Sequence, residues 1–160
     1  MTQIEFPRFW RGRFGRYAPL IFWIIVIFVA SSNTGSMTNT SRIFRPLLEF
    51  LFPNISELQL TEFHGYIRKA AHLTFYFILG ALAARAFSSS FNNLLRRNWL
   101  PISFAVVFIV AAVDEWNQSF LASRTGSIRD VLIDVCGGSI ALLICFLLTK
   151  SKKHSSKIQF

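Results

Sequence analysis

The sequence predicts an all-α fold: a polytopic membrane bundle of four transmembrane helices that forms a single domain over residues 1–160. Hydrophobic residues make up 52% of the chain and charged residues only 16%, which would leave a soluble protein of this size with an apolar exterior. Four apolar stretches approach the roughly 17 to 25 helical residues that cross a hydrocarbon core. At 160 residues the chain has no room for a second folded unit beside such a bundle.

The predicted helices cover approximately Phe14–Ser32, Tyr66–Phe87, Leu100–Leu121 and Ile128–Thr149. The basic region before the first stretch is long for a signal peptide, so we expect this stretch to be retained as a helix. The other three stretches carry ionisable residues near one end. A charge near a helix end costs less to insert than a charge at the bilayer centre, so these residues do not argue against spanning.

Lys and Arg are unevenly distributed around the predicted spans. With the N-terminus inside, the inner segments hold eleven of the 17 basic residues: Arg8, Arg11, Arg13, Arg16, Arg85, Arg96, Arg97, Lys150, Lys152, Lys153 and Lys157. The outer segments hold the rest: Arg42, Arg45, Arg68, Lys69, Arg124 and Arg129. This excess predicts that both termini lie in the cytoplasm. Basic residues beside apolar segments also favour contacts with membrane lipids over nucleic acid.

The first outer loop, from about Asn33 to Gly65, is unusually long for a compact bundle. Its stretch SRIFRPLLEFLFP places apolar side chains close to helical spacing, which favours a short helix at the membrane surface. A hydrophobic loop that caps the bundle is the alternative. The apolar positions are Ile43, Leu47, Leu48, Leu51 and Phe52.

The predicted topology brings ionisable residues of three helices to one extracytoplasmic level. Lys69, His72 and Tyr76 share one face of the second helix, and Asp130 and Asp134 lie one turn apart on the fourth. The candidate ligand-binding or catalytic residues are Arg68, Lys69, His72 and Tyr76 from the second helix, Asp114, Glu115 and Gln118 from the third, and Arg124, Arg129, Asp130 and Asp134 from the following turn and helix.

Two local patterns position this layer. Ser127 and Asp130 have the spacing of a capping box, which predicts the start of the fourth helix and holds a carboxylate at its positive end. Gly80 and Gly137 each begin a small-xxx-small step, which lets helix backbones approach closely beneath the polar layer.

The formal charges of the cluster nearly balance, so one interpretation is an ion-pair network that joins three helices. Burying so many charges is a costly way to join helices, however, and ionisable groups inside membranes usually mark a site. His72 titrates near neutral pH, which suits proton transfer or metal ligation. The chain has no close-spaced ligand pair such as HExxH, and its serines lie in no nucleophile elbow. We therefore predict neither a metal nor another cofactor.

In these segments the sequence resembles the VanZ-like family of bacterial membrane proteins. The resemblance rests on HLTFYFILG (72–80), DEWNQSFLASRTGSIRD (114–130) and VLIDVCGG (131–138), and it covers about half of the chain. Asp134 departs from the family pattern, which usually has Asn at this point. The resemblance implies a multi-helix protein of the bacterial inner membrane whose motif-bearing part covers about 66–149, and it brings no settled reaction. It also implies the motif residues His72, Glu115, Gln118, Arg124 and Asp130.

The best-known relative is associated with resistance to teicoplanin, a lipid-tailed glycopeptide. The leading hypothesis is therefore recognition of an anionic lipid-like or glycopeptide-like molecule at the extracytoplasmic leaflet, with the cations contacting its phosphate or carboxylate groups. One alternative is an enzyme acting on a lipid headgroup, with Glu115 or His72 as general base and Asp130 as a further catalytic candidate. Another is a non-catalytic bundle whose polar layer fixes the helix register.

Overall fold

The structure is a computed structural model that describes residues 13–32, 45–53, 55–120 and 127–155. This part of the chain is helical and contains no strand, which confirms the all-α fold class. Its helices are α2 (Arg13–Ser31), α4 (Glu57–Ser88), α5 (Asn93–Arg97), α6 (Trp99–Ser119) and α7 (Ile128–Ser155), with one further short helix over residues 45–51. The four predicted transmembrane helices correspond to α2, α4, α6 and α7, each long and apolar enough to cross a membrane.

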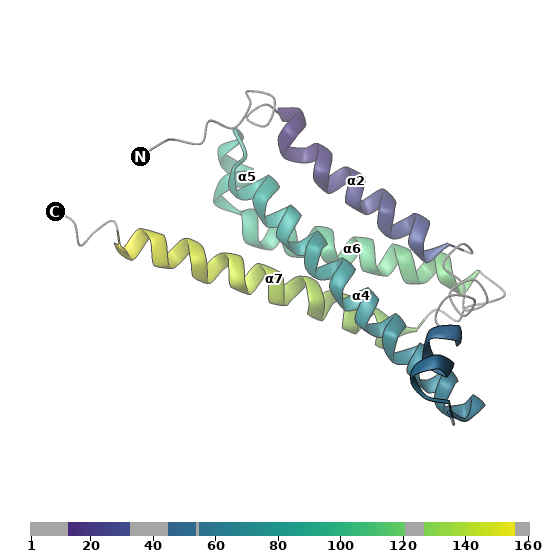
Figure 1. Ribbon diagram of the computed structural model, residues 1–160. Helices are drawn as coiled ribbons and strands as arrows, with labels where there is room; N and C mark the ends of the chain where they lie inside the picture. The colour runs from purple at the N-terminus through teal and green to yellow at the C-terminus, as the bar shows by residue number, and fades with distance from the viewer. Residues whose placement is uncertain (1–12, 33–44, 54, 121–126, 156–160) are drawn as a thin grey trace.

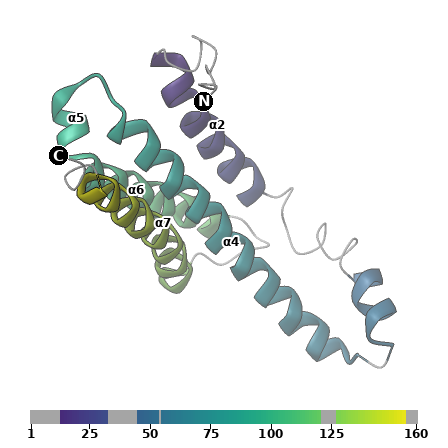
Figure 2. The ribbon, with the colours of Figure 1, turned by 60° about the vertical axis from the view of Figure 1, so that its left-hand side comes forward.

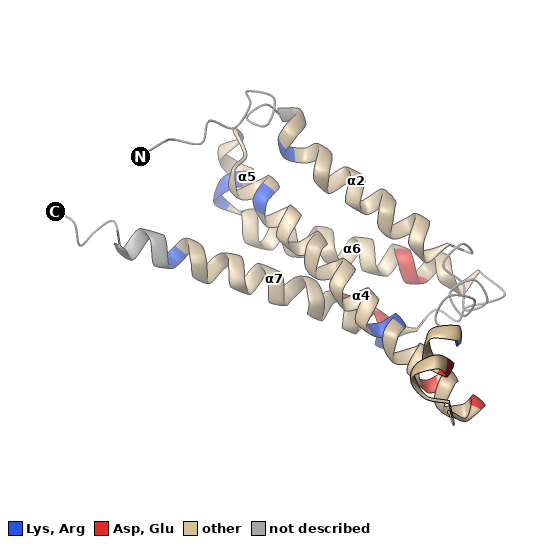
Figure 3. Ribbon diagram, in the orientation of Figure 1, with Lys and Arg blue, Asp and Glu red and all other residues tan. Residues whose placement is uncertain are grey.

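The helix α4 is the central element of the bundle: α2, α6 and α7 all pack against it. The start of α2, the end of α7 and α5 lie at one end of the bundle, and the end of α6 and the start of α7 lie at the other (Figure 1). The Asp and Glu residues of the described ranges lie towards this second end, whereas Lys and Arg also occur at the first, in and near α5 (Figure 3). The basic residues of α5 and of the last turn of α4 are Arg96, Arg97 and Arg85. We call the second end the acidic end.

Three of the four predicted spans agree with the structure at their starts to within one residue, but α4 does not. It begins at Glu57 instead of Tyr66, so the predicted loop up to Gly65 was wrong in its last part. A capping box explains the start: the Ser56 side chain accepts a hydrogen bond from the Gln59 amide, and the Gln59 side chain accepts one from the Ser56 amide. The apolar-run criterion missed this extension because polar residues interrupt it.

The extension carries α4 beyond the rest of the bundle, as Figure 2 shows. A helix of 32 residues measures about 48 Å at 1.5 Å per residue, against a hydrocarbon core of about 30 Å. The short helix 45–51 lies beside this extension and confirms the helix predicted in the long loop. Arg45 pairs with Glu49 at 2.8 Å and also with Glu57, which connects the short helix to the first turn of α4.

Small residues allow α4 and α7 to pack with their backbones close together, as the two small-xxx-small steps predict. A Cβ atom added at Gly80 would lie 2.5 Å from the Gly138 carbonyl oxygen, and one added at Gly137 would lie 2.4 Å from the Leu73 carbonyl oxygen. No side chain fits at either position without a shift of backbone. This close contact fixes the rotation of α7 relative to α4 and therefore which of their polar residues meet.

The helix α2 contacts α4 through polar as well as apolar groups. The Trp23 indole donates a hydrogen bond to the Phe75 carbonyl oxygen at 2.9 Å, and the two rings stack with centroids 5.3 Å apart. Large apolar side chains such as Phe22, Phe108 and Leu132 remain exposed on the outer faces of the bundle. Such a surface is unfavourable in water and suits a lipid environment.

Candidate functional site

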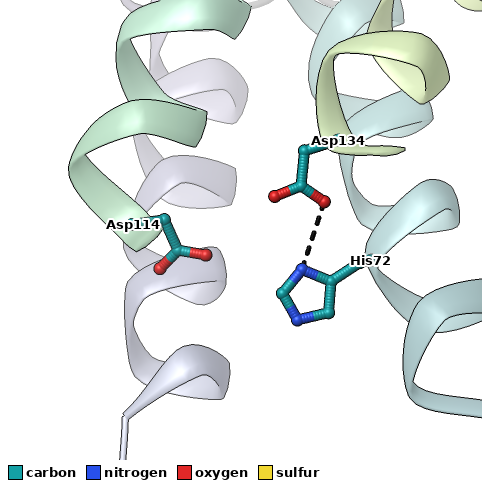
Figure 4. Close-up of side chains that lie close together, drawn as sticks. All are labelled: His72, Asp114 and Asp134. Carbon is teal, nitrogen blue, oxygen red and sulfur yellow. Dashed lines mark hydrogen bonds and ion pairs between the residues drawn. The ribbon is translucent and has the colours of Figure 1, made fainter. Parts of the chain in front are cut away.

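His72 of α4, Asp114 of α6 and Asp134 of α7 meet in a buried centre near the acidic end. Their side chains point into one space between the three helices (Figure 4). The imidazole Nδ1 of His72 lies 3.1 Å from Oδ1 of Asp134, and one ligand atom from each of the three residues lies within 4.8 Å of the others. Asp114 is 1% exposed and Asp134 is fully buried. The bundle thus encloses two carboxyl groups and an imidazole.

Three hydrogen bonds converge on a single oxygen of Asp114. Its Oδ2 accepts from Ser31 Oγ at 2.8 Å, from Gln118 Nε2 at 3.1 Å and from Tyr76 Oη at 3.4 Å. Its other oxygen, Oδ1, is buried and has no hydrogen-bond partner among the described residues. The same holds for Oδ2 of Asp134. The centre therefore holds two carboxylate oxygens whose hydrogen-bonding capacity is unused, a costly arrangement in a buried site.

Glu115, the residue after Asp114, has a different partner. Its Oε2 accepts a hydrogen bond from the Ser127 amide at 2.9 Å, while Ser127 Oγ accepts one from the Arg129 amide at 3.2 Å. Ser127 thus caps α7, as the sequence predicts, but its own amide donates to Glu115 of α6. Asp130 was predicted to make that bond, and this part of the capping-box prediction was wrong.

A pocket of about 140 Å³ opens beside the buried centre, between α4 and α7. Its lining combines two cationic side chains with the imidazole and one carboxylate: Gly65, Arg68, Lys69, His72, Asp130 and Ile133. His72 therefore belongs to both the pocket and the buried centre. Arg68 Nη2 also donates to Gln118 Oε1 at 3.4 Å, and Gln118 in turn donates to Asp114, so the pocket and the centre are connected by polar contacts.

The described residues do not form the ion-pair network that balanced charge suggested. Among them, His72–Asp134 is the one pair of the polar layer in which a basic nitrogen lies within 4.0 Å of a carboxylate oxygen. Arg68, Lys69 and Arg129 make no such contact with a described carboxylate. Arg68 and Lys69 line the pocket with Asp130, and Arg129 lies at the surface. The other acids of the layer are buried: Asp114, Glu115 and Asp134.

The predicted site residues thus fall into separate groups. Arg68, Lys69, His72 and Asp130 line the pocket. Tyr76, Gln118, Asp114 and Asp134 belong to the buried centre, and Glu115 caps α7. Arg129 is exposed and does not line the pocket, and Arg124 lies outside the described residues.

Ser31, at the end of α2, belongs to the buried centre although the sequence did not indicate it. Its hydroxyl donates to Asp114 across 83 positions of the chain. A serine at the end of an apolar run is common, so only the packing of α2 against α6 reveals this role. The first helix, which carries none of the quoted motifs, therefore supplies a side chain to the site.

Four apolar helices around a buried polar centre define a multi-pass membrane protein with a site inside the bundle. The model of the VanZ/LLP1 family matches residues 17–149, which include α4 and α6 and most of α2 and α7. The chain belongs to the VanZ-like family, as the resemblance of its motifs indicates. No curated protein and no solved structure matches the chain.

Proposed function

We propose that the chain binds the phosphate-bearing headgroup of an anionic lipid in the pocket lined by Arg68 and Lys69. The observation that carries this proposal is that both cations line the pocket and neither pairs with a described carboxylate. A cation without a counter-ion beside an apolar surface attracts phosphate strongly, and an Arg guanidinium suits its geometry. With Asp130, the ionised lining carries one net positive charge, which fits a singly charged phosphodiester.

The size of the pocket limits the part of the ligand that it can enclose. A volume of about 140 Å³ is below the roughly 300–1,000 Å³ of pockets that enclose drug-sized molecules. A phosphate with a small attached group fits, and the acyl chains would lie outside. Exposed apolar residues that adjoin lining residues in the sequence, including Tyr66, Leu73 and Leu132, offer a surface for such chains.

The excess of Lys and Arg at the opposite end supports placing the acidic end on the extracytoplasmic side. The chain would then bind lipids, or a lipid-tailed glycopeptide, in the outer leaflet of the inner membrane. Teicoplanin, to which a relative is associated with resistance, carries such a tail. A role in envelope composition or in sensitivity to lipoglycopeptides follows from this proposal.

Lipid mass spectrometry on the purified protein tests the proposal. We expect phosphatidylglycerol to be retained from mixed vesicles in preference to phosphatidylcholine. Replacing Lys69 or Arg68 with Ala removes a charge-assisted contact of about 1.5–3 kcal/mol, so retention should fall about tenfold or more. Arg97→Ala, which removes a cation at the opposite end, is the matched control. Equal retention by Lys69→Ala and Arg97→Ala would contradict the proposal.

A lipid-modifying enzyme is the second candidate, because His72 lines the pocket and is held by Asp134. A carboxylate that accepts from Nδ1 leaves the lone pair on Nε2 of the imidazole, as in a general base. His72 is favoured over Glu115, whose carboxylate already accepts from Ser127. An enzyme must generate a new lipid species in cells, and His72→Gln should abolish that species while lipid retention persists.

A further inference from the structure

The buried centre has the composition and arrangement of a metal site. It offers one imidazole and two carboxyl groups from three different helices, α4, α6 and α7. Imidazole nitrogen and carboxylate oxygen are both ligands of Zn²⁺ and of other divalent transition-metal ions. All three residues were predicted to belong to the site, but motif spacing did not identify them as metal ligands, because it reveals ligands only when they come from one or two neighbouring turns.

The distances within the set are close to those that a bound ion requires. Zn²⁺ binds nitrogen and oxygen at about 2.0–2.2 Å, which places two ligands of a tetrahedral site roughly 3.4 Å apart. The contact of His72 Nδ1 with Asp134 Oδ1 measures 3.1 Å, and the whole set lies within 4.8 Å. Closure around an ion requires side-chain shifts of about an ångström, which the rotation of carboxyl and imidazole groups provides.

The unused oxygens provide an independent observation. The Oδ2 atom of Asp114 accepts three hydrogen bonds, whereas the buried Oδ1 has no partner among the described residues. Metal-binding carboxylates are oriented in this way: outer partners hold one oxygen, and the other faces the ion. Asp134 also has a buried oxygen, Oδ2, without a hydrogen-bond partner among the described residues, while its Oδ1 contacts His72, which is itself a member of the set.

The charge of the buried centre is the third argument for a metal site. Two carboxylates inside a membrane need compensation, since unpaired buried charge is strongly unfavourable. Among the described residues, no Lys or Arg lies within 4.0 Å of Asp114 or Asp134. A divalent cation would neutralise both carboxylates and give the free Oδ1 of Asp114 a partner.

We propose that His72, Asp114 and Asp134 bind a divalent transition-metal ion, with Ser31, Tyr76 and Gln118 orienting Asp114. The ion would have three protein ligands and an open position for water, the arrangement of catalytic rather than closed structural sites. Because His72 also lines the pocket, this open position would lie close to a bound headgroup. The proposal does not depend on lipid binding.

Metal content tests the proposal directly. The full chain is purified without an affinity tag, and a chelator removes any bound metal. The chain is then loaded with Zn²⁺ alone or Mn²⁺ alone, washed, and its metal content is measured by elemental mass spectrometry. We expect about one ion per chain with at least one of the two metals. Asp114→Asn and Asp134→Asn should weaken binding by more than the 10- to 100-fold that is typical for loss of an orienting partner.

Asp130→Asn is the matched control, because it makes the same chemical change one turn from Asp134 in α7 and lies outside the three-ligand set. It should bind the ion as the unaltered chain does. Lys69→Ala should also keep its ion while losing lipid, so that failure of the lipid proposal and failure of the metal proposal are distinguishable. Less than about a tenth of an ion per chain, with both metals, would overturn the metal site and favour a proton shared between the two carboxyl groups.

Two further measurements keep the test decisive if a ligand variant fails to fold. Ser31→Ala keeps all three ligands and should weaken binding by about 10- to 100-fold. Added Zn²⁺ or Mn²⁺ should raise the Tm of the unaltered chain and of Asp130→Asn, because an ion that binds only the folded state stabilises it. Unchanged ion affinity in Ser31→Ala, or a Tm that neither metal raises, would contradict the proposal.

Discussion

Two adjacent acidic residues of α6 contribute to different parts of the structure. Successive helical residues point about 100° apart, so Asp114 faces His72 and Asp134 while Glu115 reaches the start of α7. The sequence presents them as one acidic pair. Their different partners become apparent only when α2, α4 and α7 are packed around α6. Asp114 then belongs to the buried centre, and Glu115 caps α7.

This division gives a prediction for Glu115. Replacing it with Ala removes the acceptor for the Ser127 amide and should lower the free energy of unfolding by about 1–3 kcal/mol, the usual cost of losing a partner of a buried group. Thermal unfolding in detergent measures the effect. The control is Glu62→Ala, at an exposed position of α4. Equal Tm values for the two variants would show that Glu115 has no capping role.

At the scale of the helix, glycine determines how closely α4 and α7 approach. Gly80 and Gly137 each lie against backbone atoms of the opposite helix, so their contacts cannot be relieved by side-chain rotation. Gly65 lies on the same helix as Gly80 but has no atom within 4 Å of its added Cβ. We therefore expect substitution by alanine to have opposite effects on stability at the two kinds of position.

Gly80→Ala and Gly137→Ala should each destabilise the bundle by about 1–3 kcal/mol through overpacking. Gly65→Ala should instead stabilise it by about 0.5–1 kcal/mol, since alanine loses less conformational entropy in a helix. Unfolding in detergent compares the three variants. The prediction fails if Gly80→Ala and Gly137→Ala are as stable as Gly65→Ala.

Most of the helices, but less of the site, could be predicted from the sequence. Spanning a membrane demands long apolar runs, and these fixed α2, α6 and most of α7. The start of α4 could not be predicted in this way, because its first turn contains the polar residues Glu57 and Gln59. A capping box determines where this helix begins. The layer of ionisable residues was visible, but the contact between His72, Asp114 and Asp134 depends on helix rotations that packing at Gly137 and Gly138 sets.

For the whole molecule, α4 joins the two regions that matter for function. Its middle carries His72 into the buried centre, and its extended start projects past the bundle beside the short helix 45–51 (Figure 2). All described carboxyl groups lie towards this end, whereas the opposite end carries cations near α5 (Figure 3). The side of the membrane that the acidic end faces therefore decides which leaflet supplies a ligand to the pocket.

Labelling of single cysteines determines that side. With the native Cys136 and Cys145 replaced by Ala, Glu62→Cys marks the α4 extension and Asn93→Cys marks α5. Because cytoplasmic flanks retain Lys and Arg, a membrane-impermeant maleimide should label Glu62→Cys in intact cells and Asn93→Cys only after permeabilisation. The reverse pattern would place the pocket in the cytoplasmic leaflet and exclude ligands confined to the outer one. Lipid binding and the metal site would survive that result, since both rest on the geometry of α4, α6 and α7.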